Sequence, residues 1–390
     1  MKKDLLFIPG PVTCAEPVLA AMAKPMVDHR GAAFAELLER IARGMQPIFG
    51  TKHDVVILGS SGTGGLEAAV ASMFEAGDKL LACPVGVFGE RIIAIAREFG
   101  CDVEVLETPW GSAVDPVQLA ARLAADTKKE ITGILLTHNE TSTGVQNRMA
   151  ELADAIRGHG AFVVVDSVSG LAASDFRMDE WGFDVVVTAS QKALAVPPGL
   201  AMVAVSDRAW LKMDACASSR YYFDLAKARE FAHLGQTPWT PPISIAYALD
   251  VAITLYNEEG PDNVWARHAR YARAIRAAAD AMGIDSFSQP NAHSVTVVAL
   301  HAPSGVDVPK LRKSIHAAQG VVIGGGQARL KGKIIRIGTM GDLSQTDVLG
   351  ALGALEIGLL EQDYKLQVGS GVQAALKVFL GEGAALVANR

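Results

Sequence analysis

A lysine and an aspartate in this chain each follow an apolar, strand-like segment. Residues 162–166 (FVVVD) end on Asp166, and residues 184–190 (DVVVTAS) lead toward Lys192, which lies shortly before two prolines and a glycine. In open parallel sheets, ligands bind where the carboxyl ends of neighbouring strands meet. The separation of 26 residues (192 − 166) is about one excursion plus one strand, so we expect the two side chains to share a pocket. A lysine that reaches solvent and a carboxylate that caps a helix are the ordinary alternatives.

A glycine-rich segment, residues 60–65 (SSGTGG), follows another apolar run and leads directly into a helical pattern. Its glycines allow close backbone approach, and the hydroxyls of Ser61 and Thr63 join free N–H groups of a helix start, which favour an anion such as phosphate. The segment is neither G-x-G-x-x-G nor a Walker A loop, because no lysine follows it. A plain glycine turn with a serine cap is the alternative.

A lysine, a carboxylate and a phosphate cradle are together what pyridoxal 5′-phosphate (PLP) requires of a protein. The lysine forms a Schiff base with this cofactor, the carboxylate keeps the pyridine nitrogen protonated, and a helix start holds the phosphate. On these residues alone, PLP is one hypothesis among several.

Strand-like and helix-like segments alternate from residues 54–59 (DVVILG) to residues 200–206 (LAMVAVS), which indicates βαβ units and a mostly parallel sheet. The last of these strands follows a short connection, so we expect it to be antiparallel. From about Ser244 the patterns indicate long helices and a second, α+β domain. We place the large domain at residues 15–255 and the small domain at residues 256–390.

Other patterns predict no metal site and no further ligand loop. Residues 324–332 (GGGQARLKG) begin with three consecutive glycines but lead into no helix, so we expect a flexible hairpin there rather than a nucleotide loop. The nine histidines form no H-x-x-x-H or H-E-x-x-H arrangement, and the four cysteines have irregular spacings without C-x-x-C.

The composition argues against several classes of function. Half of the 390 residues are hydrophobic, which is ample for a large core. The net charge of -6 gives no basic footprint for nucleic acid, and charges and prolines interrupt every apolar run before it could span a membrane. Pro9 and Pro11 also cut the N-terminal apolar run short of a signal-peptide core. We therefore expect a cytoplasmic protein.

Several segments resemble, in order, those of one known family: FIPGPV, SSGTGGLEAA, GVFGER, THNETSTG, VVDSVSG, SQKAL with PPG, QTPWTPP and IIRIGTMG. The family is that of the class V PLP-dependent aminotransferases of fold type I, and the alanine–glyoxylate and serine–glyoxylate (serine–pyruvate) branch is the most similar. The resemblance implies an α/β fold, with a large domain built on a mostly parallel seven-stranded sheet between helices. It also implies a smaller C-terminal α+β domain, with residues 1–14 near the active site.

The resemblance assigns the cofactor's ring to five residues. Lys192 is expected to form the Schiff base and to move the α-proton of the substrate, while Asp166 pairs with the pyridine nitrogen. Val168 and Phe88 are expected to cover the two faces of the ring, and Thr141 to lie near its hydroxyl.

The remaining expected contacts concern phosphate, substrate and a second subunit. The resemblance implies that the phosphate contacts Ser61, Gly62, Thr63 and Gln191, and that Arg336 binds the α-carboxylate of the substrate. Thr237 and Thr240 are expected to reach the phosphate in the neighbouring subunit's site, so the active protein is expected to be a homodimer. No metal is expected.

The activity that the resemblance implies is amino transfer from a small amino acid, with alanine or serine expected, to a 2-oxo acid such as glyoxylate or pyruvate, by a ping-pong mechanism. The alternatives are another class V enzyme, such as an aspartate- or ureidoglycine-using aminotransferase or a lyase resembling cysteine desulfurase. Desulfurases typically carry histidine at the positions of Gln191 and Phe88 and a late mobile cysteine, whereas the last cysteine here is Cys216. A non-catalytic ligand-binding protein of the same fold is a further alternative.

Overall fold

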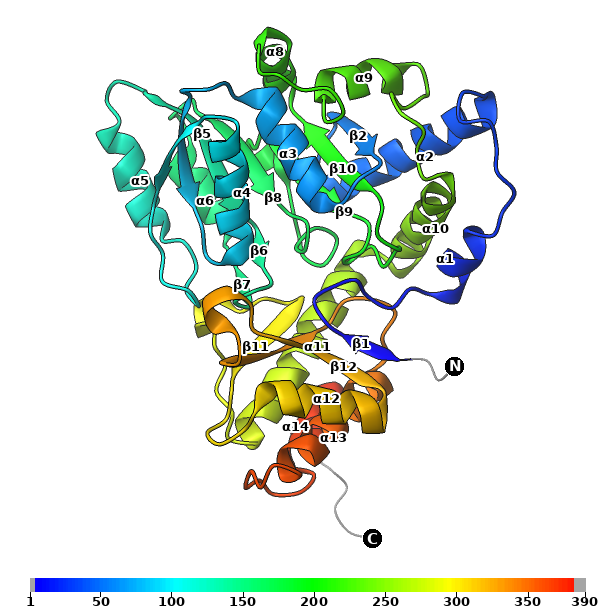
Figure 1. Cartoon of the computed structure of the whole chain (residues 1–390), viewed down its shortest axis with the longest axis vertical. Helices are drawn as coiled ribbons and strands as arrows, with labels where there is room; N and C mark the ends of the chain where they lie inside the picture. Colours follow the sequence, from blue (N-terminus) through cyan, green and yellow to red (C-terminus); the bar gives the residue numbers. More distant parts are fainter. Residues whose placement is uncertain (1–3, 382–390) are drawn as a thin grey trace.

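A seven-stranded sheet forms the centre of the larger part of the molecule in the computed structural model, which describes residues 4–381 (Figure 1). Its strand order is β2-β10-β9-β8-β5-β3-β4. The strands are β2 (Asp54–Leu58), β3 (Lys79–Cys83), β4 (Asp102–Val105), β5 (Ile131–Thr137), β8 (Phe162–Asp166), β9 (Val185–Ala189) and β10 (Ala201–Val205). All neighbours are parallel except β10, which is antiparallel to both β2 and β9. The expected antiparallel strand is thus confirmed.

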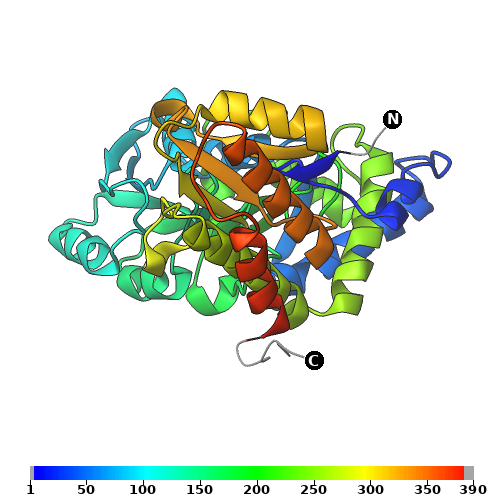
Figure 2. The ribbon, with the colours of Figure 1, turned by 90° about the horizontal axis from the view of Figure 1, so that it is seen from below.

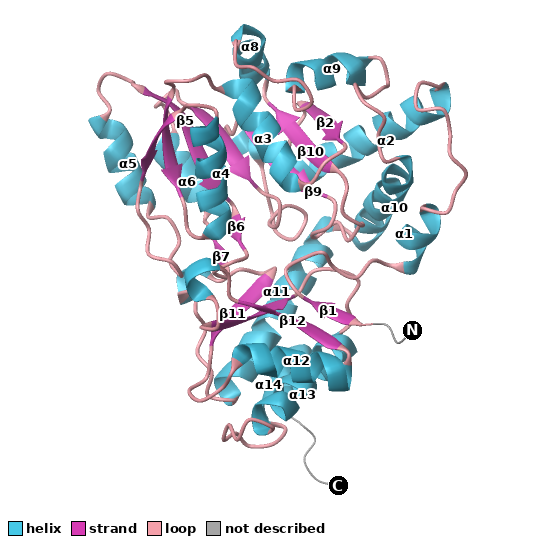
Figure 3. Cartoon of the chain, viewed as in Figure 1, coloured by secondary structure: helices cyan, strands magenta, loops and turns pink. Residues whose placement is uncertain are grey.

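Helices cover both faces of this sheet, because strand residues bury their side chains alternately on either side (Figure 3). In β2, for example, Val55 and Ile57 join one core and Val56 and Leu58 the other. The first core also contains α1 (Glu16–Ala21), α2 (Ala32–Phe49), α5 (Pro116–Ala125), α6 (Met149–Ile156), α7 (Met178–Trp181) and α10 (Ile243–Glu259). The second contains α3 (Gly62–Met73), α4 (Val87–Glu98), α8 (Asp207–Ala215) and α9 (Leu225–His233).

A second, four-stranded sheet lies below the first in the view of Figure 1, with strand order β1-β12-β13-β11. Its strands are β1 (Leu5–Phe7), β11 (Val297–His301), β12 (Val321–Gly325) and β13 (Ile334–Gly338). Four helices share a core with one face of it: α11 (Pro261–Ala281), α12 (Val308–Gln319), α13 (Gln345–Leu360) and α14 (Ser370–Leu380). Figure 2 shows β1, in blue, beside the strands of the C-terminal half.

Four strands were not predicted as strands from the sequence: β1, β12 and the two of a short hairpin described below. The N-terminal strand β1 pairs in parallel with β12, so the N-terminal segment joins the sheet of the C-terminal part. The glycine segment 324–332 begins inside β12 and leads to β13, which pairs antiparallel with β12. The segment therefore forms the expected hairpin. A two-stranded hairpin of β6 (Asn139–Glu140) and β7 (Val145–Gln146) also forms. Residues 1–3 and 382–390, which the expected domain ranges include, lie outside the described part.

Helix boundaries follow ordinary capping chemistry. α12 begins after Asp307, whose carboxylate accepts from the Lys310 N–H at 2.9 Å, and Ser344 and Asp347 form a reciprocal capping box at the start of α13. α2 and α12 each end at a glycine in the left-handed region, with φ of 62° at Gly50 and 69° at Gly320.

Helix α3 lies close to the central strands because glycines occupy three of its first four positions. A Cβ added to Gly65 would lie 2.7 Å from Val187 Cγ1 and 3.0 Å from Ala201 Cβ. This contact fixes the start of α3 against the carboxyl end of β9, which is where Lys192 follows.

We expect Gly65→Ala to lower the free energy of unfolding by about 1–3 kcal/mol, because the added methyl overpacks α3 against β9 and β10. Urea denaturation of the purified variant measures this change. Gly350→Ala is the matched control: it lies within α13, and no described atom stands within 4 Å of its added Cβ. The control is expected to gain about 0.5–1 kcal/mol; equal effects of the two variants would contradict the close-packing explanation.

Candidate active site

Asp166 and Lys192 line one cavity of about 260 Å³ at the carboxyl edge of the large sheet. Asp166 ends β8, and Lys192 follows the neighbouring strand β9, with which β8 pairs in parallel. Nine of the residues expected in the site line this cavity: Ser61, Gly62, Thr63, Phe88, Thr141, Asp166, Val168, Gln191 and Lys192. Leu66, Arg91, Asn139 and Ser169 complete the lining. The sheet therefore brings together residues that are far apart in the sequence.

Asp166 is buried, with 5% of the residue exposed, and lines the cavity. Burial raises its pKa to about 7, with a further upward contribution from Glu140, while the Val168 N–H and the cations Lys192 and Arg91 oppose the shift. The Val168 N–H donates to Oδ1 at 3.0 Å. A cationic partner at this carboxylate would therefore hold it ionised at neutral pH.

The Lys192 ammonium donates to the carbonyl oxygen of Pro9, from the segment that follows β1. Gly10 lies against the same side chain, since a Cβ added there would stand 2.8 Å from both Cδ and Nζ of Lys192. Burial lowers the pKa of Lys192 to about 8, against the opposing effect of Asp166. The lysine is thus close to neutral at mildly alkaline pH, as a nucleophilic amine needs to be.

The start of α3 forms a cradle for an anion on one side of the cavity. Ser61 is the N-cap residue, yet its side chain accepts no capping hydrogen bond, so the first N–H groups of the helix are open to another acceptor. A Cβ on Gly62 would lie 2.7 Å from Val168 Cγ2, so only glycine leaves this space. Arg91 donates to Thr63 Oγ1 at 3.1 Å and adds a positive charge beside the cradle.

The residues of this cavity fit a phosphorylated pyridine cofactor. The cradle supplies N–H groups, two hydroxyls and a guanidinium for the phosphate. Gln191 lines the cavity with a buried side-chain oxygen that has no hydrogen-bond partner in the described structure. Phe88 and Val168 offer apolar surface to a ring, with Asp166 and Lys192 as its polar partners.

Helix α4 presents Phe88 to the cavity, and its start is capped by side chains from the β6–β7 hairpin. Glu140, which is fully buried, accepts from the N–H groups of Phe88 at 2.9 Å and Gly89 at 3.0 Å, and Ser142 Oγ accepts from Val87 at 3.0 Å. Burial raises the pKa of Glu140, against the hydrogen bonds of these donors. The hairpin therefore fixes the aromatic wall of the cavity.

Arg336 comes from the small sheet and reaches toward the same hairpin. It lies between Ile335 and Ile337, both of which face the helices of the small sheet, so its own side chain points to the opposite face. Nη1 donates to the Thr141 carbonyl at 2.9 Å. Burial lowers the pKa of Arg336 to about 10, so the guanidinium remains charged at neutral pH.

Comparison with known proteins shows the family of this chain. Residues 17–338 match the family described as aminotransferase class-V. The chain belongs to the class V aminotransferase family.

Relatives within this family carry several names. The chain is 36% identical to an L-aspartate–glyoxylate aminotransferase of Paracoccus denitrificans (95% of this chain, 94% of the relative) and 35% identical to a serine–glyoxylate aminotransferase of Methylorubrum extorquens (96% and 95%). It is also 36% identical to a protein of Anabaena cylindrica named soluble hydrogenase 42 kDa subunit (97% and 99%). Among solved structures, pyridoxamine–pyruvate aminotransferase from Mesorhizobium loti superposes with a TM-score of 0.93 at 32% identity, covering 98% of both chains.

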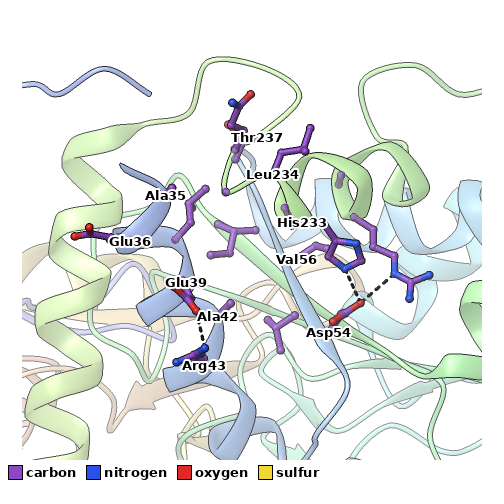
Figure 4. A pocket seen from close by; sticks show the side chains of 18 of the residues that line it. Ala35, Glu36, Glu39, Ala42, Arg43, Asp54, Val56, His233, Leu234 and Thr237 are labelled. Carbon is purple, nitrogen blue, oxygen red and sulfur yellow. Dashed lines mark hydrogen bonds and ion pairs between the residues drawn. The ribbon is translucent and has the colours of Figure 1, made fainter. Parts of the chain in front are cut away.

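Three residues expected in the site of this class V chain do not line the cavity: Arg336, Thr237 and Thr240. Arg336 lies beside it, through its hydrogen bond to the Thr141 carbonyl. Thr237 lines a separate cavity of about 650 Å³ between α2, β2 and α9 (Figure 4). Its hydroxyl donates to the Trp239 carbonyl at 2.7 Å. Thr240 is exposed at the surface. One chain by itself therefore does not bring these threonines to the cavity of Lys192.

Asn139 is a residue that sequence reasoning missed, although it stands in the same THNETSTG segment as Thr141. It is buried, and its amide nitrogen donates to Ser169 Oγ at 2.8 Å and to Thr296 Oγ1 at 2.9 Å, while Ser294 Oγ donates to its oxygen at 2.6 Å. Ser169 lines the cavity, and Ser294 and Thr296 directly precede β11 of the small sheet. Asn139 thus joins the cavity wall to the sheet that carries Arg336.

Cys216 is placed far from the cavity, which argues against the desulfurase alternative for this class V chain. Its thiol lies near the carbonyls of Ala71 and Phe74, at the end of α3 opposite the cradle. A helix of this length separates its two ends by about 18 Å. Within residues 4–381, no group of three or more histidine, cysteine or acidic side chains could hold a metal ion.

We expect the reactivity of the Lys192 amine toward an acylating reagent to rise with pH through a midpoint of about 8, because only the neutral amine reacts and burial lowers its pKa. Brief acetylation of cofactor-free protein, followed by peptide mass spectrometry, measures this midpoint. Exposed lysines in the same digest are the internal control, with midpoints expected near 10.4. A Lys192 midpoint equal to that of the exposed lysines would contradict the assigned environment.

Proposed function

We propose that this chain is a PLP-dependent aminotransferase that moves an amino group from a small amino acid to a 2-oxo acid such as glyoxylate or pyruvate. The observation that carries the proposal is the single cavity in which Lys192, Asp166 and the uncapped start of α3 meet. When bound, the cofactor supplies an electron-withdrawing ring that accepts the electron pair of the substrate's α-carbon.

Lys192 is proposed as the covalent anchor of the cofactor. It is also proposed as the base whose Nζ takes the α-proton of the substrate and then donates that proton back to complete the amino transfer. Its lowered pKa supports this role, because a general base works best with a pKa near the working pH. Asp166 is proposed to hold the proton of the pyridine nitrogen. Phe88 and Val168 then enclose the ring between apolar surfaces and exclude water from it.

The proposed phosphate contacts are Ser61, Gly62, Thr63 and Gln191, and Thr141 is proposed to lie near the ring hydroxyl. Arg91 is added to this set by its hydrogen bond to Thr63. The substrate's α-carboxylate is assigned to Arg336, since a guanidinium binds a carboxylate through two parallel hydrogen bonds.

Alanine and serine are the donors that we propose first, with glyoxylate or pyruvate as the acceptor. Relatives named for serine with glyoxylate and for aspartate with glyoxylate support a small donor and a short acceptor. The relative named for pyridoxamine and pyruvate marks a second possibility, in which the amino donor lacks a phosphate. The cradle at α3 favours the phosphorylated cofactor.

A homodimer with shared sites is proposed for the assembly. The loop that carries Thr237 and Thr240 also carries Trp239, which stacks on Tyr222 at 5.7 Å between ring centroids and packs at a tilt against Tyr221 at 4.9 Å. Tyr221 is 71% exposed, as an aromatic group at a subunit interface would be in a single chain. A second copy seated on this loop would bring the threonines to its own cavity.

The remaining proposals concern domains and compartment. We propose the large domain at residues 15–255 and the small domain at residues 256–390, with residues 1–14 near the active site; the contact of Pro9 with Lys192 supports the last point. A reducing, cytoplasmic location is proposed from the four cysteines, all of which are free thiols. Within the described part, no helix is long and apolar enough to cross a membrane.

We expect Lys192→Ala to abolish both cofactor attachment and turnover. The protein loaded with PLP should be yellow, borohydride should add the mass of the reduced cofactor to the peptide containing Lys192, and the variant should lose this adduct. Keto-acid production from alanine, serine or aspartate with glyoxylate should fall by at least about 10³-fold in the variant, because covalent attachment and proton transfer are both lost.

Lys310→Ala is the control for that experiment, since Lys310 is exposed on α12 in the small-sheet half. It should keep both the colour and the rate. A parallel assay with unphosphorylated pyridoxamine and pyruvate separates the second possibility. A wild-type protein that binds neither PLP nor pyridoxal would overturn the proposed function, and an unchanged rate in Lys192→Ala would overturn the assigned base.

We expect mixed dimers of two inactive variants to recover activity, because each site is shared between two subunits. A double variant, Thr237→Val with Thr240→Val, should bind PLP more weakly, because each partner's phosphate loses its hydroxyl contacts. Co-expression of this double variant with Lys192→Ala places one intact site in each mixed dimer. At a PLP concentration that leaves the double variant inactive, the mixture should recover roughly a quarter of the wild-type rate; no recovery by purified mixed dimers would contradict the sharing.

A further inference from the structure

The guanidinium of Arg336 is held by three partners of unequal strength. Nε donates to the Gly325 carbonyl at 2.7 Å, and Nη1 donates to the Thr141 carbonyl at 2.9 Å and to Gln327 Oε1 at 3.4 Å. Within residues 4–381, no hydrogen-bond partner of Nη2 is found. The arginine is thus held beside Thr141, which lines the cavity, and its Nη2 has no partner among the described residues.

A carboxylate that binds Arg336 through two hydrogen bonds needs N–H groups on two adjacent nitrogens. Nε is engaged with a backbone carbonyl at 2.7 Å, so the edge formed by Nη1 and Nη2 is the one that remains. To use it, the carboxylate must accept a hydrogen bond from an Nη1 N–H group that now donates to either Thr141 or Gln327. The bond to Gln327 is the longer of the two and comes from a rotatable side chain, so it is the one that yields.

We propose that Gln327 is a positioning residue whose amide oxygen holds Arg336 in place until the α-carboxylate of a substrate takes over the same N–H group. The inference rests on the proposed function, because it takes Arg336 to be the carboxylate site. Gln327 thereby competes with the substrate and sets the affinity for the carboxylate, while leaving the chemistry at Lys192 untouched.

The glycine segment that delivers Gln327 has little freedom to place it elsewhere. A Cβ added to Gly326 would lie 1.8 Å from the Leu330 carbonyl oxygen, and one added to Gly324 would lie 3.2 Å from Arg336 Cβ. Ala328 has a φ of 45°, in the left-handed region, and the Arg329 guanidinium stands 3.6 Å from the centre of the Trp110 ring. The close contacts at Gly324 and Gly326 and the contact of Arg329 with Trp110 therefore restrain the turn that carries Gln327.

The charges around this turn favour an anion. A Cβ on Gly325 would stand 3.1 Å from Nη1 of Arg312, and the charge of Arg312 lowers the pKa of Arg336. The opposing negative group is Glu140, whose charge raises that pKa. A neutral amide at position 327 leaves the guanidinium available to an incoming carboxylate, whereas a permanent carboxylate there would occupy it.

The test compares Gln327→Glu with Gln327→Leu by the binding of propionate, an unreactive carboxylate, to the PLP-loaded protein in calorimetry. The resident carboxylate of Gln327→Glu should weaken propionate binding by at least about tenfold, which corresponds to about 1.4 kcal/mol. Gln327→Leu removes the competitor and should bind propionate at least as tightly as the wild type. In turnover, KM for donor and acceptor should move in the same directions, with kcat changed less than about threefold.

A merely structural role for Gln327 would not give opposite effects for these two substitutions. Gln373→Glu, at an exposed position on α14, controls for added negative charge and should leave propionate binding unchanged. Equal weakening by Gln327→Glu and Gln327→Leu, or unchanged binding in Gln327→Glu, would overturn the inference. If Gln327→Glu does not fold, weakened binding in Gln327→Leu alone overturns it, and binding as tight as that of the wild type supports it.

Propionate binding requires no turnover, so the two proposals fail separately. A protein that transfers no amino group but shows the contrast between the Gln327 variants would refute the proposed function and support the role of Gln327. A protein that transfers amino groups but shows no contrast between the Gln327 variants would support the proposed function and refute the role of Gln327.

Discussion

The site depends on keeping a carboxylate and an amine of opposite charge at the ends of two neighbouring buried strands. Water is largely excluded there, and both groups respond in the direction that burial dictates: the pKa of Asp166 rises to about 7 and that of Lys192 falls to about 8. Each partly compensates the other, and Arg91 and Glu140 supply a second pair of opposite charges nearby. The surrounding structure serves to hold these four groups in place while keeping the cavity open.

Two kinds of contact hold them. Close helix packing brings the start of α3 to the strand edge, and this requires the absence of side chains at Gly62 and Gly65. Long-range capping is the other kind: Glu140 satisfies the first N–H groups of α4 from about fifty residues away in the chain, and Asn139 links the cavity wall to the small sheet. Glycines permit the first kind of contact, and buried polar side chains of the β6–β7 hairpin make the second.

Much of this arrangement could be predicted from the sequence, because strand ends are readable from apolar runs. The alternation of strands and helices, the antiparallel β10 and the meeting of Asp166 with Lys192 follow from such runs and from their spacing. Asn139, Glu140, Arg91 and Gln327 were missed because their roles arise from contacts between distant segments, which no local pattern records. Arg91 had one usable signal, since it lies three residues after Phe88 and hence on the same helix face. The strands β1 and β12 were missed for a similar reason: β1 is only three residues long and forms a strand through a partner more than three hundred residues away.

The pairing of β1 with β12 has a mechanical consequence. The carbonyl of Pro9, which accepts from Lys192, follows β1 by two residues, and β1 is hydrogen-bonded into the sheet that carries Arg336. The contact that restrains the amine and the group assigned to the substrate's carboxylate therefore belong to the same sheet. Any displacement of that sheet relative to the large one would move both groups together.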